Sequence, residues 1–163
     1  LLYYPVGANL ITHTLSPLAG LLSFPFQFVN LTFAFNVILL LGFILSCFFG
    51  YMLVRHLTQE KYSAFVGGII FGFSPMHLSQ TFIGHLNWTS IEFVPLFVLL
   101  FLLMIEKKEL KYIFGSAISF LLVLFFGDPE QGIMALIIAF FILLLCCTIQ
   151  AYSLGNLSQV CLY

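Results

Sequence analysis

Long apolar runs, interrupted by charge at only a few points, are the feature that most limits what this chain can form. Charged residues make up 7% of its 163 residues, and hydrophobic residues make up 62%. A soluble domain carries roughly 25% charged residues, so this chain lacks the polar surface that water requires. Lipid is therefore the expected solvent for most of it, and we predict an all-α fold, a polytopic transmembrane helical bundle.

The apolar runs are compared with the length of about 20 residues that a membrane-spanning helix needs. We predict about five spanning helices, at residues 31–56, 62–76, 90–106, 111–127 and 130–150. The second and fourth runs are short, about 15 to 17 residues or roughly 24 Å of helix. Backbone that leaves a helix below the lipid surface must be buried in protein or face a watery cavity, so these short runs predict a pocket.

The segments outside the spans divide residues 1–163, which we treat as a single transmembrane domain. Residues 1–30 are predicted to be an outer loop followed by a short interfacial or re-entrant segment that contains Pro25. The bundle covers residues 31–150, and residues 151–163 are predicted to be a cytoplasmic tail or a link to further spans. Because the chain opens on Leu1 without a basic leader, it is interpreted as a fragment of a longer protein.

Small residues recur at four-residue spacing in the first two runs. Gly42, Ser46 and Gly50 form one stripe, and Gly68 and Gly72 form a GxxxG motif. Such stripes let two helix backbones approach closely in a membrane. We therefore predict close helix contacts at these positions.

Basic residues fall at only two places in the chain. The basic residues lie in or beside two short turns, and they are Arg55, Lys61, Lys107, Lys108 and Lys111. If the spans alternate, both turns lie on one side, and short loops rich in Lys and Arg face the cytoplasm. Loops 57–61 and 107–111 are thus predicted to be cytoplasmic. Loops 1–16, 76–89 and 127–131 are predicted to be extracytoplasmic.

Polar residues that carry chemistry gather in the outward loops. The candidate pocket residues are His13, His85, Asn87, Asp128 and Glu130. Ionisable groups at membrane depth are costly and often mark functional sites. Asp128 also has a structural interpretation, because Asp-Pro-Glu-Gln resembles a helix start in which Asp128 caps and Gln131 completes a capping box.

The other candidates keep two interpretations each. Glu130 either makes a favourable contact with the helix dipole or holds a cation, a sugar hydroxyl or a proton. His85 and Asn87 are either solvated loop residues or recognise phosphate or sugar. His13, His77 and His85 match no compact metal motif, so no metal site and no cofactor is predicted in this fragment. A net charge of −1 gives no sign of a nucleic-acid partner.

Several motifs in residues 1 to 100 resemble a large group of prokaryotic membrane proteins. They are Tyr4-Pro5-x-Gly7-x-Asn9-Leu10-x-x-His13-Thr14, Pro17-Leu18-x-Gly20-Leu21-Leu22, Ala34-x-Asn36, Arg55-His56-Leu57-Thr58, Phe71-x-Phe73-Ser74-Pro75 and Gly84-His85-Leu86-Asn87. That group is similar to the GT-C glycosyltransferases, polytopic enzymes that use lipid-phosphate sugars.

The resemblance implies a function for the whole protein. A polyprenyl-phosphate sugar donor would enter from the bilayer, and an acceptor would be glycosylated at the extracytoplasmic face. The catalytic acid of that superfamily, a base or metal ligand in the first outer loop, would lie upstream of Leu1, so no catalytic residue is assigned here. A divalent metal in the full protein is possible on this basis.

Two other functions stay open. A membrane transporter or lipid flippase would also suit short spans, and an acid deep within a span would favour it. A non-catalytic membrane scaffold subunit is the third hypothesis. The expected partners are the lipid bilayer, a lipid-linked sugar donor and the remaining transmembrane helices of the same protein.

Overall fold

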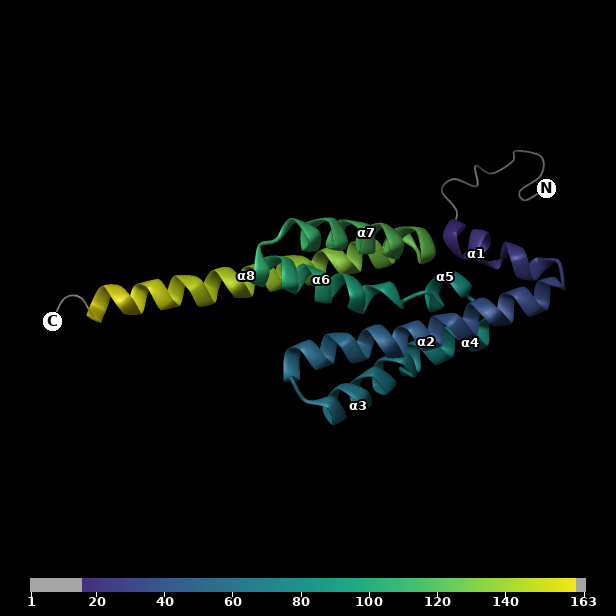
Figure 1. Cartoon of the computed structure of the whole chain (residues 1–163), viewed down its shortest axis with the longest axis horizontal. Coiled ribbons are helices and arrows are strands. Elements are labelled where there is room, and N and C mark those ends of the chain that lie inside the picture. Colours follow the sequence, from purple (N-terminus) through teal and green to yellow (C-terminus); the bar gives the residue numbers. More distant parts are fainter. Residues whose placement is uncertain (1–15, 161–163) are drawn as a thin grey trace.

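The computed structural model describes residues 16 to 160, and from residue 150 it describes the helix alone. The chain order is α1 (Pro17–Gln27), α2 (Leu31–Thr58), α3 (Lys61–Gly72), α4 (Pro75–Ile83), α5 (Leu86–Thr89), α6 (Phe93–Lys107), α7 (Leu110–Phe126) and α8 (Pro129–Val160). All regular structure in the described residues is helical, which confirms the predicted all-α class. Figure 1 shows the long helices side by side, with α8 extending beyond the others.

Three of these helical segments are long and apolar enough to cross a membrane. They are Leu31–Thr58, Leu86–Lys107 and Pro129–Ile149, and α7 is a shorter apolar helix. The second candidate includes both α5 and α6, which follow each other closely. Length and composition of the described helices thus suit an integral membrane protein.

The second predicted span is shorter than expected, and the predicted loop at 76–89 is wrong. Helix α3 ends at Gly72, after 12 residues. Ser74 then caps a new helix by accepting a hydrogen bond from the backbone N–H of His77, with Pro75 at its first position. Most of the supposed loop is therefore helical, in α4 and α5. Ser-Pro is a helix-start signal as well as a helix-end signal, which explains the error.

The last helix is also longer than the fifth predicted span. Helix α8 continues from Pro129 to Val160, so the expected tail at 151–163 is helical at least through residue 160. The predicted interfacial segment contains α1, a helix of 11 residues with Pro25 inside it.

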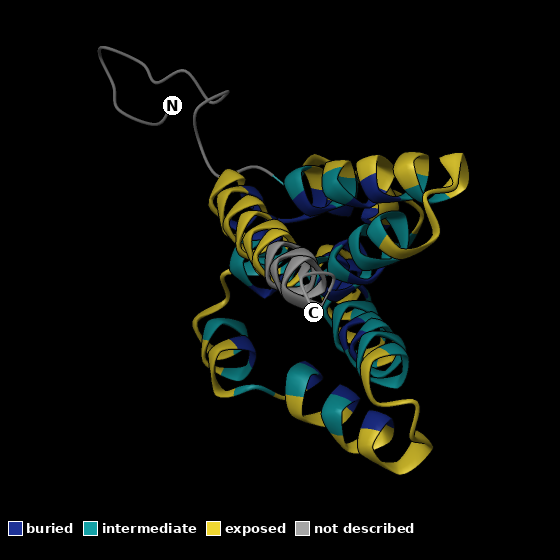
Figure 2. Ribbon diagram, turned by 90° about the vertical axis from the view of Figure 1, so that its left-hand side faces the viewer, coloured by how far each residue is buried: buried dark blue, intermediate teal, exposed yellow. Residues whose placement is uncertain are grey.

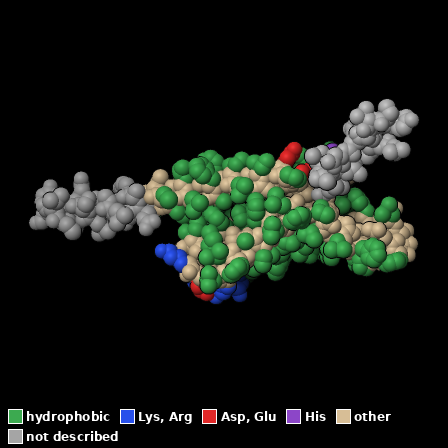
Figure 3. All heavy atoms as spheres, turned by 90° about the horizontal axis from the view of Figure 1, so that it is seen from above, with side chains coloured by type: hydrophobic (Ala, Val, Ile, Leu, Met, Phe, Trp, Pro, Cys, Tyr) green, Lys and Arg blue, Asp and Glu red, His purple; other side chains and the backbone are tan. Residues whose placement is uncertain are grey.

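The outer surface of the helices is apolar. Figure 2 shows exposed residues on the outward sides of the helices and buried residues on their inward sides. Large side chains more than half exposed include Leu40, Phe65, Ile118, Leu136 and Phe140. Hydrophobic side chains cover most of the face in Figure 3. Such continuous apolar exposure is unfavourable in water and favourable in lipid.

The GxxxG motif forms the contact between α2 and α3. A Cβ built on Gly68 would lie 2.5 Å from the Cys47 carbonyl oxygen, and one on Gly72 would meet the Cys47 Sγ. No real side chain fits at those separations, so the absence of a side chain is what lets the two backbones approach. On α2 the same contact uses Gly50, whose added Cβ would lie 3.3 Å from the Gly68 Cα. The predicted close contact is confirmed for these three glycines.

A hydrophobic core with three Phe rings joins α1, α2, α6, α7 and α8. The buried residues that form it are Ala19, Ile38, Phe93, Phe97, Val123, Phe126, Ala135 and Ala139. At its centre the rings of Phe93 and Phe126 lie 4.9 Å apart between centroids, which ties α6 to the end of α7. Phe49 of α2 contacts Phe93 at 5.8 Å. Such ring pairs contribute about 0.5–1.5 kcal/mol each beyond the area they bury.

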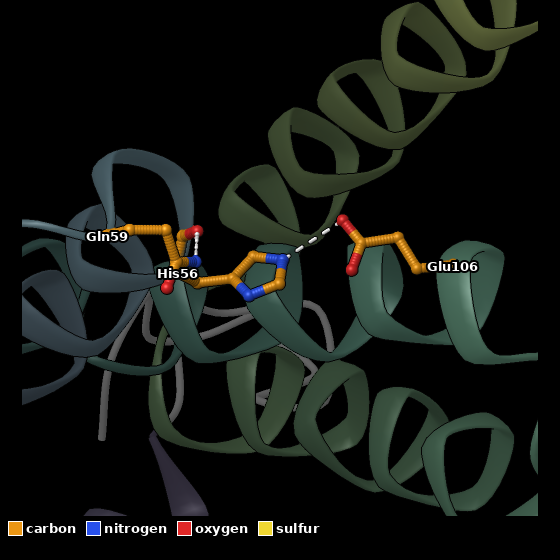
Figure 4. A network of polar contacts seen from close by, with 3 residues as sticks. All are labelled: His56, Gln59 and Glu106. Carbon is orange, nitrogen blue, oxygen red and sulfur yellow. Dashed lines mark hydrogen bonds and ion pairs between the residues drawn. The ribbon is translucent and has the colours of Figure 1, made fainter.

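The two basic turns lie at one end of the bundle. His56 Nε2, near the end of α2, is 3.1 Å from Glu106 Oε1, near the end of α6 (Figure 4). In the same view the Gln59 side chain donates to the His56 carbonyl oxygen at 2.5 Å. Because the basic turns follow directly after α2 and α6, this contact brings them together. Lys and Arg side chains accordingly gather at one end of the molecule in Figure 3.

The turn between α2 and α3 is set by its own side chains. Gln59 takes the left-handed conformation that ends α2. The Glu60 carboxylate then accepts hydrogen bonds from the backbone N–H groups of Tyr62 and Ser63. Hydrogen bonding from Ser63, and then from Tyr62, holds the pKa of the Glu60 carboxyl below its ordinary value. The ionised carboxylate is therefore the form that caps α3 at neutral pH.

The α2–α3 contact gives a first prediction. Gly68→Ala should lower the free energy of unfolding by about 1–3 kcal/mol, because the added methyl group overlaps backbone that cannot move aside. Gly20→Ala is the matched control, since nothing lies within 4 Å of a Cβ at Gly20. Thermal unfolding of both variants in nanodiscs measures the difference. Equal stability of the two variants would show that α2 and α3 are not in this close contact.

Candidate functional site

A buried polar cluster lies at the opposite end from the basic turns. The Asn87 side-chain amide of α5 donates to Asp128 Oδ2 at 2.8 Å, across 41 residues of sequence. The Gln131 side chain of α8 donates to the Asn87 carbonyl oxygen at 2.9 Å. Asp128 is 3% exposed and Gln131 is 7% exposed. These bonds fasten the start of α8 to α5, beside the start of the third predicted span.

The predicted capping box at Asp128 is wrong in its side-chain part. Pro129 does stand at the start of α8, and the Asp128 backbone carbonyl accepts from Gln131 N–H at 2.9 Å. The Asp128 carboxylate, however, accepts from Asn87. The Gln131 side chain reaches α5 rather than folding back on Asp128. The side chains of Asp128 and Gln131 therefore form hydrogen bonds with α5, and not with each other as in a capping box.

Gly127 makes room for this cluster. A Cβ on Gly127 would overlap the Gln131 Oε1 and would lie 2.9 Å from the Val123 carbonyl oxygen. The Gly127 carbonyl also accepts a hydrogen bond from the Ser16 hydroxyl at 3.5 Å, which brings the start of α1 to the same place. The end of α7 thus favours glycine, because the Val123 backbone carbonyl cannot move aside and the Gln131 side chain would have to leave its position. Sequence spacing alone did not indicate this.

A pocket of about 320 Å³ adjoins the cluster. Its lining is largely apolar, from Phe71, Met76, Ile91, Val94, Met134 and Ile138, and it also includes Trp88, Asp128, Glu130 and Gln131. The pocket therefore lies between α8 and the ends of the shorter helices α3 to α6. A volume of this size is within the range of small-molecule sites, and a few polar groups on an apolar lining are typical of them.

The predicted site residues do not all meet. Asn87, Asp128 and Glu130 lie together, and Asp128 and Glu130 line the pocket. His85 is exposed, with its Nδ1 3.1 Å from Gln80 Oε1, and it does not line this pocket. His13 lies outside the described residues.

Glu92 is the buried acid that the sequence analysis left without a role. It precedes α6, is 2% exposed, and its Oε2 has no hydrogen-bond partner among the described residues. A Cβ on Gly42 would lie 3.8 Å from that oxygen, so Glu92 faces the small-residue stripe of α2. Ser46, one turn further along the same side of α2, is fully buried with an unpartnered hydroxyl. In the sequence, the stripe of small residues at Gly42 and Ser46 is the feature that indicates a close neighbour on this side of α2.

His77 is a structural residue in this arrangement. It is 1% exposed and lies stacked on Phe43 of α2, with ring centroids 4.2 Å apart. Its Nδ1 donates to the Gly72 carbonyl oxygen at 2.7 Å, which fastens α4 to the end of α3. Within the described residues, no three His, Cys, Asp or Glu side chains are grouped as metal ligands would be.

The chemistry available at the pocket follows from its polar atoms. Ionised carboxylates only accept hydrogen bonds, whereas the amide of Gln131, which also lines the pocket, both donates and accepts. Such a set suits hydroxyl groups and cations and disfavours anions. Comparison with family models, with curated proteins and with solved structures finds no match to this chain. The features of the molecule that bear on function are therefore the pocket, the polar cluster beside it and the apolar helices around them.

The Asn87–Asp128 hydrogen bond yields a second prediction. Asn87→Asp should lower the free energy of unfolding by about 1–3 kcal/mol, because it places a second carboxylate against a buried one. Adding Asp128→Asn should recover most of that loss, since the donor and acceptor are then exchanged. Thermal unfolding of the two single variants and the double variant forms the cycle. If the two effects simply add, the side chains do not interact.

Proposed function

We propose that this chain is part of a membrane glycosyltransferase that moves a sugar from a polyprenyl-phosphate donor to an acceptor at the extracytoplasmic face. The observation that carries the proposal is the pocket, which has carboxylate and amide side chains in an otherwise apolar lining, among helices of membrane-spanning length. The resemblance of the first hundred residues to the GT-C glycosyltransferases supports the same function.

Glycosyl transfer explains the polar rim chemically. Transfer requires a base near the acceptor hydroxyl and stabilisation of the leaving phosphate. Asp128 and Glu130 would accept hydrogen bonds from sugar or acceptor hydroxyls and so orient them. All Lys and Arg residues of the chain lie in the two turns at the other end. Stabilisation of the phosphate would therefore come from a metal or from another part of the protein.

We further propose five crossings, the second of them broken. Helix α3 alone is about 18 Å long, too short for a hydrocarbon core of about 30 Å. Helices α3 and α4 together would complete the crossing, with the break at Ser74. α2, α6, α7 and α8 would make the other four. The basic end would then face the cytoplasm, and the pocket would face the other side.

This orientation predicts which positions react with a membrane-impermeant maleimide. His85→Cys, at an exposed position directly after α4, should be labelled from outside intact cells. Glu109→Cys, exposed in the second basic turn, should be labelled only after the cells are opened. The parent protein without an added cysteine is the control for its native thiols. Labelling of both positions from the same side would reject five crossings.

Sugar transfer itself is the decisive measurement. Asp128→Asn and Glu130→Gln should each lower transfer of labelled sugar from a polyprenyl-phosphate donor by about 10- to 100-fold, the effect of losing a charge-assisted hydrogen bond of about 1.5–3 kcal/mol. Glu109→Gln, at the opposite end, should leave transfer unchanged. The assay uses the full-length protein in membranes, with thermal unfolding to show that each variant is folded. Wild-type protein that transfers nothing across a broad donor panel would overturn the proposal.

Transport is the second candidate function, and Glu92 is the observation that favours it. A buried carboxylate within a candidate span, with Oε2 unpartnered among the described residues, is typical of proton or ion pathways. If the protein is a transporter, Glu92→Gln abolishes substrate flux in proteoliposomes while Glu130→Gln has a smaller effect. If it is a glycosyltransferase, Glu92→Gln leaves sugar transfer near the wild-type rate. Absence of both transfer and flux would leave the scaffold hypothesis.

A further inference from the structure

The charge of the pocket is unbalanced. Two carboxylates, Asp128 and Glu130, line it, and no salt bridge in the described residues involves either of them. The side chain that donates to Asp128 is neutral, namely the Asn87 amide, and the Asn87 backbone carbonyl in turn accepts from the Gln131 side chain. Every Lys and Arg of the chain belongs to the basic turns at the other end. The pocket is therefore lined by two acidic residues with no basic side chain paired to either of them among the described residues.

Burial of the Asp128 carboxylate without a cation beside it is energetically unfavourable. Asp128 is 3% exposed, so little water reaches its carboxylate. The Asn87 side-chain amide donates a hydrogen bond to its Oδ2. A buried carboxylate is strongly favoured by a cation placed beside it and disfavoured when left alone. An ammonium group in the pocket would supply up to three N–H donors and a positive charge.

The rest of the lining fits such a group and what is attached to it. Trp88 lines the pocket together with the carboxylates, and an indole face attracts ammonium groups. Most of the remaining lining is apolar, formed among others by Ile91, Val94, Met134 and Ile138. An alkyl chain against that wall would bury apolar surface while its charged end stays at the polar rim.

We infer that this pocket binds an amphiphile with a primary ammonium head and an alkyl chain, the head beside Asp128, Glu130 and Trp88. A phosphate head is excluded from this position by the same two carboxylates. The pocket is therefore separate from the place where a lipid phosphate would be held. This inference does not depend on the proposed glycosyltransferase function, because it concerns binding alone.

The test is a fluorescence titration of the full-length protein in zwitterionic nanodiscs. Subtracting the signal of Trp88→Phe isolates the emission of Trp88. The probes are dodecylamine, dodecanol and dodecyl phosphate, which share a chain and differ in their head. Dodecylamine should give a saturable change, with an apparent Kd at least tenfold lower than that of either other probe.

Two variants and a control complete the design. Glu130→Gln should weaken dodecylamine binding about tenfold, and because Glu130 is exposed its replacement should leave folding intact. Asp128→Asn should also weaken dodecylamine binding about tenfold, and its amide oxygen can still accept the hydrogen bond from Asn87. Glu109→Gln should change nothing. An equal response to dodecanol, or a preference for dodecyl phosphate, would overturn the inference. Since no sugar is transferred in this titration, its failure is distinguishable from failure of the glycosyltransferase proposal.

Discussion

The absence of water from the bilayer interior is the constraint on which this structure depends. Each backbone N–H and C=O at that depth must be hydrogen bonded within the protein, and an unsatisfied group costs several kcal/mol. The chain meets this demand with helices and with side chains that close their ends. Asn30 accepts from Phe33 N–H at the start of α2, and Ser74 accepts from His77 N–H at the start of α4. Gln131 donates to the carbonyl of Asn87 within short α5.

Lipid outside the bundle removes the usual hydrophobic drive for helices to associate. Close packing then becomes the main attraction, and it explains why glycine matters so much between α2 and α3. Gly68 and Gly72 let the helices meet at backbone distance around Cys47. Further along α2, Gly42 leaves room for the Glu92 carboxylate instead of another helix backbone. The small residues of α2 thus make room for two different neighbours, the backbone of α3 at Gly50 and the Glu92 carboxylate at Gly42.

The two ends of the bundle have opposite chemistry. One end holds every Lys and Arg, with acids such as Glu106 and Glu109 beside them. The other end holds Asp128 and Glu130 with neutral partners, next to a pocket with an apolar wall. Because charges of one end are far from those of the other, the pocket keeps its negative character. This separation is the physical basis for both proposals about what the protein binds.

Hydropathy and spacing alone indicated helices apolar and long enough for a membrane, the helical class and most helix positions, because each depends on neighbours within a few turns. They also marked the glycines of a close helix contact, but not which residues those glycines meet. The same information misplaced the segment after Ser74, where one Ser-Pro pair both ends α3 and starts α4. It grouped Asn87, Asp128 and Glu130 as candidates, yet it did not show that Asn87 bonds to Asp128, or that Gln131 reaches across to α5. Nor did it show that Glu92 is buried against Gly42. Those facts were decided by how the helices cross, since a polar side chain takes the partner that packing brings to it, and packing joins residues 41 or more positions apart.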